Sequence, residues 1–171
     1  LNHLNYFLLT ELLLDVLKKT SQQYGEARVI NVSSEASRGG QIDFNNLQGE
    51  RKYFGWSAYS QSKLANILFT NELARRIDSG VTANSLHPGF VATKFGHNNG
   101  AALSGLMRLT QLFAKTPQQG AETSIFLASS PMVSGKTGGY YVDSRLRQPP
   151  PKAEDVELAA RLWQVSEELT G

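Results

Sequence analysis

Tyr59 and Lys63 are the two residues whose types and spacing could carry proton chemistry in this sequence. They lie four residues apart in an expected helix, so their side chains project from the same helix face. A free phenol has a pKa near about 10, and a neighbouring ammonium favours the phenolate and lowers that pKa. The pair could therefore exchange a proton with a substrate hydroxyl or carbonyl group. Taken alone the spacing is common, and a solvated helix surface explains it better.

Ser34 adds a hydroxyl group at the end of an expected strand, Arg28–Val32. In parallel sheets ligands bind beyond the carboxyl ends of the strands, and the helix that carries Tyr59 should begin at that rim. The Ser34 hydroxyl could donate to a substrate oxygen and fix the geometry of proton transfer. The competing interpretation is that Ser33 and Ser34 only end the strand through side-chain-to-backbone hydrogen bonds. A serine nucleophile is disfavoured because no GxSxG motif is present.

A Pro-Gly turn follows the next expected strand, Val81–Leu86, in the stretch HPGFVAT. Glycine at position 89 lets the backbone approach a ligand closely, and Thr93 offers a hydroxyl group. Read alone, Pro88 and Gly89 fit an ordinary turn equally well. His87 has no acidic partner that is evident in the sequence.

The elements that must position these residues alternate between helices and strands. We expect an opening helix that ends before the break at Tyr24-Gly25-Glu26, further helices over 58–78, 116–129 and 153–169, and a third strand over 138–143. We expect a long loop over 35–57 and a loop with some helix over 96–115. The expected inward-facing residues are Leu64, Ile67, Leu68, Leu73 and Ile77 in the second helix, and Val156, Leu158, Ala159, Leu162 and Trp163 in the last. This alternation predicts an α/β fold with a parallel sheet and right-handed crossovers.

Composition excludes several classes of function. The 171 residues, 40% of them hydrophobic, suffice for one core. Seventeen basic and fifteen acidic residues leave a net charge of +2. The sequence contains no long run of basic residues, so a nucleic-acid-binding surface is not expected. The absence of cysteine excludes disulfides and thiolate catalysis and suits a reducing cytoplasm. The three histidines are scattered, so no metal site is expected. The apolar run near the start is interrupted by Glu11 and Asp15, so we expect no membrane segment.

Four motifs together resemble the short-chain dehydrogenase/reductase family. They are Asn2 in LNHLNYFLL, Ser34 in RVINVSS, Tyr59 and Lys63 in AYSQSKLAN, and the HPGFVAT turn. Their shared order and spacing make the resemblance far more specific than any single motif. Within the family the chain most resembles the retinol dehydrogenase-like branch, through NVSS, the insertion IDFNNLQGERKY and the stretch SKLANILFTNELARR. The resemblance covers essentially the whole chain.

This resemblance implies a catalytic tetrad of Asn2, Ser34, Tyr59 and Lys63. Tyr59 would be the general acid in carbonyl reduction and the general base in alcohol oxidation. Lys63 would lower the pKa of Tyr59 and hydrogen-bond the nicotinamide ribose. Ser34 would orient and polarise the substrate carbonyl. Asn2 would hold a water molecule that links Lys63 to solvent. The remaining residues implied to line the nicotinamide are Pro88, Gly89, Val91 and Thr93.

The implied activity is the NAD(P)-dependent interconversion of an alcohol and a carbonyl, with hydride supplied or accepted by the cofactor. The branch favours NADP(H) over NAD(H), an apolar small-molecule substrate such as a retinoid-like aldehyde or ketone, and a homodimer. A cytoplasmic location is expected, with membrane association through preceding residues left open. The alternatives are a non-catalytic interaction protein on the same fold and a light-driven enzyme resembling protochlorophyllide reductases. The tetrad disfavours the first alternative, and the absence of cysteine disfavours the second.

One part of the family pattern does not occur in this sequence. The TGxxxGxG loop, the residues that discriminate the adenine ribose and the NNAG strand all precede the position of Asn2 in the family. We therefore expect residues 1–171 to form the C-terminal catalytic part of one Rossmann-type, doubly wound parallel sheet. It would supply strands five to seven of the family order, with an open edge where the fourth strand pairs.

Overall fold

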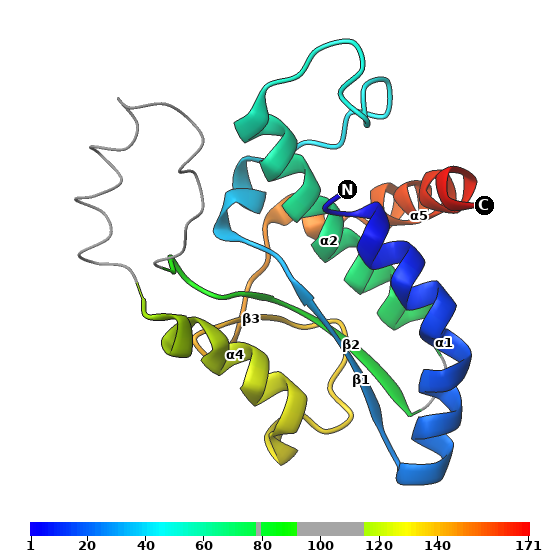
Figure 1. Cartoon of the computed structure of the whole chain (residues 1–171), viewed down its shortest axis with the longest axis vertical. Coiled ribbons are helices and arrows are strands. Elements are labelled where there is room, and N and C mark those ends of the chain that lie inside the picture. The colour runs from blue at the N-terminus through cyan, green and yellow to red at the C-terminus, as the bar shows by residue number, and fades with distance from the viewer. Residues whose placement is uncertain (78–79, 92–114) are drawn as a thin grey trace.

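The computed structural model describes residues 1–77, 80–91 and 115–171. In this part of the chain a four-stranded sheet has the order β1-β2-β3-β4, with helices on both faces (Figure 1). The strands are β1 (Ala27–Val32), β2 (Val81–His87), β3 (Tyr140–Val142) and β4 (Arg145–Arg147). The first three strands pair in parallel and β4 runs antiparallel to β3. The predicted α/β class with a parallel sheet is confirmed.

The short strand β4 was not predicted. It follows Asp143 and Ser144, which adopt φ values of 51° and 56° in a tight turn of the kind that joins antiparallel strands. All three of its residues are exposed, so no alternation of apolar and polar side chains marks it. The third predicted strand, 138–143, is correspondingly shorter in the structure.

Two helices cover one face of the sheet, α1 (Leu4–Tyr24) and α2 (Gly55–Arg76), and α4 (Pro117–Ser129) covers the other. The helix α2 begins at Gly55 rather than at the predicted Ala58, and Phe54 provides no side-chain cap. The predicted start of α4 is confirmed, since Thr116 and Gln119 form a capping box. Short 3-10 helices occupy η1 (Glu35–Gly39), η2 (Pro131–Val133) and η3 (Pro151–Glu154), so the predicted loop over 35–57 contains one turn of helix.

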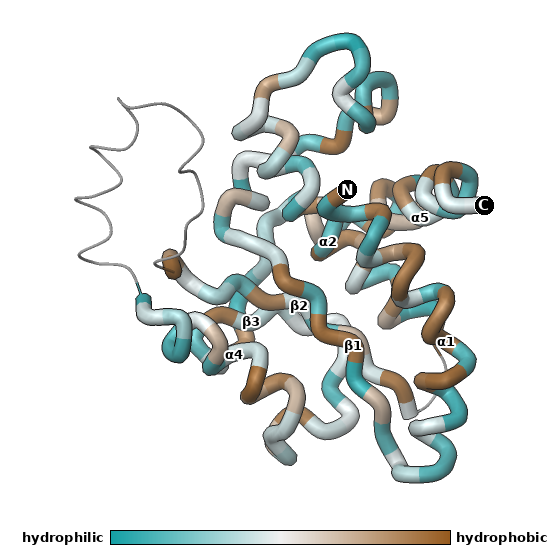
Figure 2. The backbone as a smooth tube through the Cα atoms, viewed as in Figure 1, coloured by the Kyte–Doolittle hydropathy of each residue, from teal (hydrophilic) through white to brown (hydrophobic). Residues whose placement is uncertain are grey.

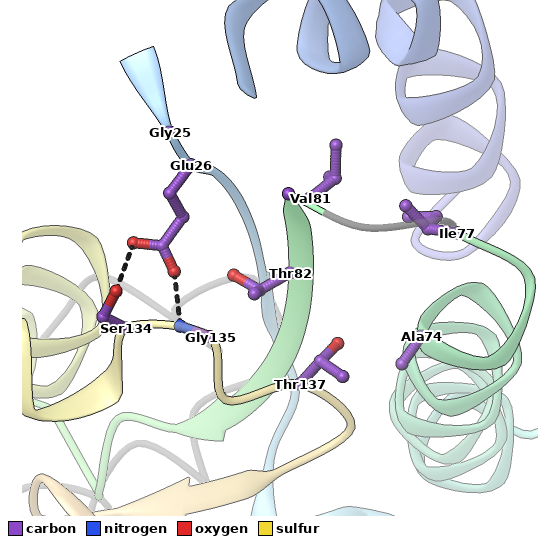
Figure 3. Close-up of a pocket in the computed structure, with 10 residues that line it drawn as sticks. Gly25, Glu26, Ala74, Ile77, Val81, Thr82, Ser134, Gly135 and Thr137 are labelled. Carbon is purple, nitrogen blue, oxygen red and sulfur yellow. Dashed lines mark hydrogen bonds between the residues drawn. The ribbon is translucent and has the colours of Figure 1, made fainter. Parts of the chain in front are cut away.

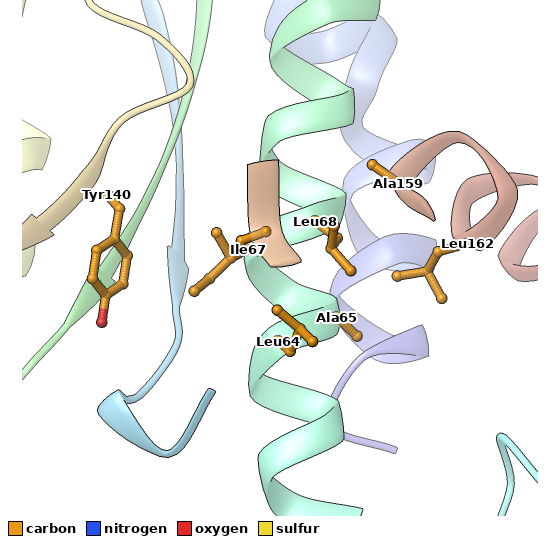
Figure 4. Packing of buried hydrophobic residues seen from close by; sticks show 8 residues of the cluster. Leu64, Ala65, Ile67, Leu68, Tyr140, Ala159 and Leu162 are labelled. Atoms are coloured by element: carbon orange, nitrogen blue, oxygen red, sulfur yellow. The ribbon is translucent and has the colours of Figure 1, made fainter. Parts of the chain in front are cut away.

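The core is built around α2, which lies between the sheet and α5 (Val156–Thr170) (Figure 4). Leu64, Ile67, Leu68 and Leu73 are completely buried, as predicted, and Ile77 is half-buried. Each fully buried aliphatic side chain contributes about 1.5–3 kcal/mol through removal of apolar surface from water. Neighbours on both sides of α2 explain why burial extends beyond a single stripe.

Burial in α5 follows the prediction at Ala159, Leu162 and Trp163. The prediction for Val156 is wrong, because this side chain is 54% exposed. Val156 is the first residue of α5, directly after the N-cap Asp155, and the buried part of the helix begins one turn later.

Apolar side chains also remain on the surface of α1, and Figure 2 shows that hydrophobic residues recur along this helix. Leu9, Leu12 and Val16 are 60%, 71% and 58% exposed. Phe7 on the inner side is buried against Phe69 and Trp163. No helix of the described residues combines the length and the apolar character needed to cross a bilayer.

Candidate active site

Ser34 and the turn that contains Pro88 follow strands that end at one rim of the sheet. His87 at the end of β2 pairs with Val142 of the parallel strand β3, and β1 lies on the other side of β2. Ser34 therefore follows β1 and Pro88 follows β2 at the same rim. Parallel sheets place their ligands here, beyond the carboxyl ends of the strands.

The Lys63 ammonium lies over the Tyr59 ring, with 5.7 Å between Nζ and the ring centroid. Lys63 Nζ also donates a hydrogen bond of 3.1 Å to the carbonyl oxygen of Val32, the last residue of β1. The predicted sharing of one helix face is thus present, and the ammonium points to the rim. Burial lowers the pKa of Lys63, because a partly desolvated ammonium loses the stabilisation that water gives its charge.

Side-chain hydrogen bonds attach α2 to the end of β1. The buried Ser33 hydroxyl donates to the carbonyl oxygen of Lys63 at 2.7 Å. Asn66 Nδ2 donates to the carbonyl oxygen of Val32 at 3.3 Å. These two bonds set the height of Lys63 along the strand end, so Ser33 has the structural role that the simpler interpretation assigned to it.

Ser34 is the N-cap of η1, and its Oγ accepts a hydrogen bond of 3.2 Å from the Ala36 amide. This is the side-chain-to-backbone bond of the competing interpretation. A hydroxyl group has one donor and two acceptor positions, and the cap uses an acceptor position. The Ser34 O–H therefore remains able to donate to a ligand oxygen at the rim.

Asn2 lies just before α1 and is exposed. Its Nδ2 donates to Ser62 Oγ at 3.4 Å, and Ser62 Oγ donates to the carbonyl oxygen of Tyr59 at 2.7 Å. The structure thus places Asn2 beside the first turns of α2. Among the described side chains no hydrogen bond joins Asn2 to Lys63, so a link between them needs an intervening group.

A cavity of about 1130 Å³ lies between the start of α1, the first turns of α2 and the loop over 41–55. Asn2 and Tyr59 both line it, as do the exposed aromatic residues Tyr53 and Phe54. Ser34, Lys63 and the residues after β2 are not among its lining residues. The structure therefore brings Asn2 and Tyr59 to one hollow, whereas Ser34 and Pro88 lie directly after the strand ends.

The turn after β2 needs glycine at position 89. Gly89 has φ of +88°, and a Cβ atom there would approach Lys115 Cδ to 2.8 Å. Lys115 forms an ion pair with Asp143, and its amide donates to the Phe90 carbonyl oxygen at 2.7 Å. Val91 forms an isolated parallel bridge with Lys115. Thr93, the last predicted residue of this stretch, lies outside the described residues, as does nearly all of the segment predicted as a loop over 96–115.

Tyr6 is a neighbour of Lys63 that sequence reasoning missed. The Lys63 ammonium lies over the Tyr6 ring, with 5.9 Å between Nζ and the ring centroid. Burial raises the pKa of Tyr6, and the charge of Tyr59 raises this pKa further. The available signal was the spacing of Asn2 and Tyr6, which are four residues apart in the sequence, with Asn2 just before α1 and Tyr6 in its first turn. That spacing gives no information on the neighbouring helix.

A second hollow of about 310 Å³ lies at the opposite ends of the strands (Figure 3). Glu26 borders it and accepts hydrogen bonds from the Gly135 amide at 2.8 Å and the Ser134 hydroxyl at 3.3 Å. The Gly135 bond is the main reason that the pKa of Glu26 lies below its usual value. Glu26 also pairs with Arg28 at 2.6 Å. The carboxylate has structural partners, and we assign no chemistry to this hollow.

Known proteins resemble the chain over almost its whole length. The family model described as short chain dehydrogenase matches residues 1–104. Human retinol dehydrogenase 14 is 46% identical over 174 aligned residues, which cover 99% of the chain and 51% of that protein. Human retinol dehydrogenases 13 and 11 are each 44% identical and are each covered over 52% of their length.

The chain belongs to the short-chain dehydrogenase family. It spans about half the length of the curated relatives it matches. A crystal structure of an uncharacterized protein from Mycobacterium paratuberculosis superposes with a TM-score of 0.72 at 32% identity, covering 99% of the chain and 56% of that protein. The resemblance drawn from the four sequence motifs is therefore confirmed at the level of the family and of its retinol dehydrogenase-like relatives.

The match to the short-chain dehydrogenase family includes the residues at the rim of the sheet. The matched region, residues 1–104, contains the four positions of the predicted tetrad and the turn after β2. Lys63, Tyr59 and the Val32 carbonyl form the part of the site with the clearest geometry in this short-chain dehydrogenase chain.

Proposed function

We propose that the protein is an NAD(P)-dependent oxidoreductase that interconverts an alcohol and a carbonyl compound. The observation that carries the proposal is the position of the Lys63 ammonium, over the Tyr59 ring and bonded to the last carbonyl of β1. A cation next to a phenol favours the phenolate. The Tyr59 Oη atom is the atom at which the proton is gained or lost.

Different residues of the chain transfer the proton, orient the substrate and exchange protons with solvent. In carbonyl reduction the Tyr59 hydroxyl donates its proton to the substrate oxygen, and in alcohol oxidation the Tyr59 phenolate accepts it. The Ser34 hydroxyl donates a hydrogen bond to the same oxygen and orients it. Asn2, beside Ser62 and Tyr59, holds a water molecule through which Lys63 exchanges protons with solvent. The nicotinamide cofactor, when bound, supplies or accepts the hydride.

The residues at the rim suit the nicotinamide end of such a cofactor. A lysine ammonium has three N–H donors, and Val32 accepts from Lys63 Nζ, which leaves donors for ribose hydroxyl groups. His87 Nδ1 is buried with no partner among the described residues. Pro88, Gly89 and Val91 would line the ring. Thr93 is assigned to the same set because of its place in the sequence motif.

Four finer features belong to the same proposal. NADP(H) is the cofactor proposed from the resemblance to the retinol dehydrogenase-like branch. An apolar, retinoid-like alcohol or aldehyde is the proposed substrate, because curated relatives of the chain are named retinol dehydrogenases and because Tyr53 and Phe54 expose aromatic rings at the cavity. A homodimer is supported by the exposed apolar side chains of α1. The cytoplasm, suggested by the cysteine-free sequence, is the proposed location.

The test is Tyr59→Phe in the full-length protein. The variant keeps the ring under Lys63 and loses the proton, so turnover of retinal with NADPH should fall by about 10²–10⁴-fold. Cofactor binding, followed by NADPH fluorescence, should change little. Tyr24→Phe is the matched control, because Tyr24 is 73% exposed at the far end of α1. Unchanged turnover in the Tyr59 variant would remove the proton role.

A further inference from the structure

The Lys63 ammonium contacts two tyrosine rings that belong to different helices. Lys63 Nζ lies 5.7 Å from the ring centroid of Tyr59 in α2 and 5.9 Å from the ring centroid of Tyr6 in α1. Both distances lie within the range of about 6 Å in which a cation is attracted to the face of an aromatic ring. Only Tyr59 has a place in the mechanism proposed above.

We propose that Tyr6 is a positioning residue, whose ring face holds the Lys63 ammonium at the end of β1 and favours its charged form. This proposal rests on the proposed function, since it concerns the same proton site. Burial alone disfavours a charged lysine, and among the described residues no carboxylate forms an ion pair with Lys63. The compensating groups include the Val32 carbonyl and the two rings.

The packing of α1 fixes the Tyr6 ring. Tyr6 is half-buried and packs against the cluster that contains Phe7, Phe69 and Trp163. The Thr10 hydroxyl donates to the Tyr6 carbonyl oxygen at 2.7 Å. The start of α1 is further attached to α5 by a buried contact of 2.9 Å between His3 Nε2 and Ser166 Oγ. The Tyr6 ring is therefore held by the packing of α1 against α2 and α5.

The ring of Tyr6, rather than its hydroxyl group, carries the proposed role. Burial and, after it, the charge of Tyr59 raise the pKa of Tyr6, so Tyr6 stays a neutral phenol near neutral pH. It then cannot compete as the proton carrier. Phenylalanine has the same ring face without the hydroxyl group, and leucine has neither, so the two substitutions separate the two possibilities.

The first experiment measures kcat/KM for alcohol oxidation against pH in Tyr6→Phe and Tyr6→Leu. Weaker support for the charged lysine leaves the Tyr59 phenolate less stable, so the alkaline rise should move upward by roughly 0.5–1 pH unit in Tyr6→Leu. Tyr6→Phe should retain the wild-type profile. A purely structural role would lower the rate at every pH without moving the rise. An equal displacement in both variants, or none in either, would overturn the role of the ring.

The second experiment needs no activity. Lysine Cε is labelled with ¹³C, and the Lys63 NMR signal is assigned by its loss in Lys63→Arg. In the wild type this signal should be displaced by the two rings relative to exposed lysines, and in Tyr6→Leu its titration midpoint should fall. Tyr6→Met replaces the leucine variant should that variant not fold. A Lys63 signal that coincides with exposed lysines in the wild type would refute the proposal. If the expected NMR displacement and lower midpoint are observed but neither the wild type nor any variant shows turnover, the proposed function is rejected and the role of the Tyr6 ring is kept.

Discussion

His3 joins the start of α1 to α5 through a buried contact of 2.9 Å between its Nε2 atom and Ser166 Oγ. The Ser166 hydroxyl already donates to the Leu162 carbonyl oxygen at 2.7 Å, so the imidazole Nε2–H is the donor. The His3 ring also contacts Phe7 and Phe69. A neutral imidazole thus lies among aromatic side chains one residue from Asn2.

Stability should fall in acid because of His3. Burial lowers its pKa from 6.5 to about 4, so the unfolded chain binds more protons than the folded one between these values. The contribution is complete above pH 6.5 and is lost as pH falls towards 4, with a total of roughly 3 kcal/mol. Urea unfolding of the wild type between pH 7.5 and 4.5 measures this slope. In His3→Gln, which cannot titrate, the slope should flatten, and an unchanged slope would show that other groups cause it.

Ser33 and Ser34 are adjacent, but replacing each with alanine should affect stability and turnover differently. Ser33→Ala removes the 2.7 Å hydrogen bond to the Lys63 carbonyl and should cost about 1 kcal/mol of unfolding free energy. Ser34→Ala removes the η1 cap and should cost about 0.5–1 kcal/mol, but it also removes the donor to the substrate oxygen. Turnover should therefore fall by about 10²-fold or more in Ser34→Ala.

Ser34→Thr is the control, because it restores both the hydroxyl group and the cap. Paired urea unfolding and turnover measurements separate the two effects. An equal loss of turnover in Ser33→Ala and Ser34→Ala would contradict a direct contact between Ser34 and substrate.

The central helix and the strands were predictable because their patterns are strong. Leu64, Ile67, Leu68 and Leu73 repeat at helical spacing, and all four are buried. The β-branched runs gave β1 and β2, and parallel pairing follows from the long helix between them. The common rim of Ser34 and Pro88 is a consequence of that topology alone.

Other features depend on how elements pack, which one sequence does not reveal. Tyr6 meets Lys63 only because α1 and α2 lie side by side on the same face of the sheet. The start of α2 was misplaced because Gly55 is a poor helix residue and Phe54 is no cap. The burial of His3 was missed because Ser166 lies at the other end of the chain.

Gly89 should be the least replaceable of three glycines that differ in one property at a time. Gly89 combines a φ of +88° with a Cβ position 2.8 Å from the Lys115 side chain, Gly135 has a φ of +68° in open space, and Gly39 has neither constraint. An L-residue in the left-handed region costs roughly 1–2 kcal/mol. Gly135→Ala should therefore lose about that much unfolding free energy and Gly39→Ala almost none.

Gly89→Ala should exceed Gly135→Ala, because the new methyl group also displaces Lys115 from its ion pair with Asp143. The exposed pair itself contributes at most about 1 kcal/mol, so the excess should be of that size. Lys115→Ala removes the obstacle, and in that background Gly89→Ala should cost the same as Gly135→Ala. Urea unfolding of the five proteins and the wild type measures each difference. An excess that persists without the Lys115 side chain would place the constraint in the backbone of the turn rather than in the contact.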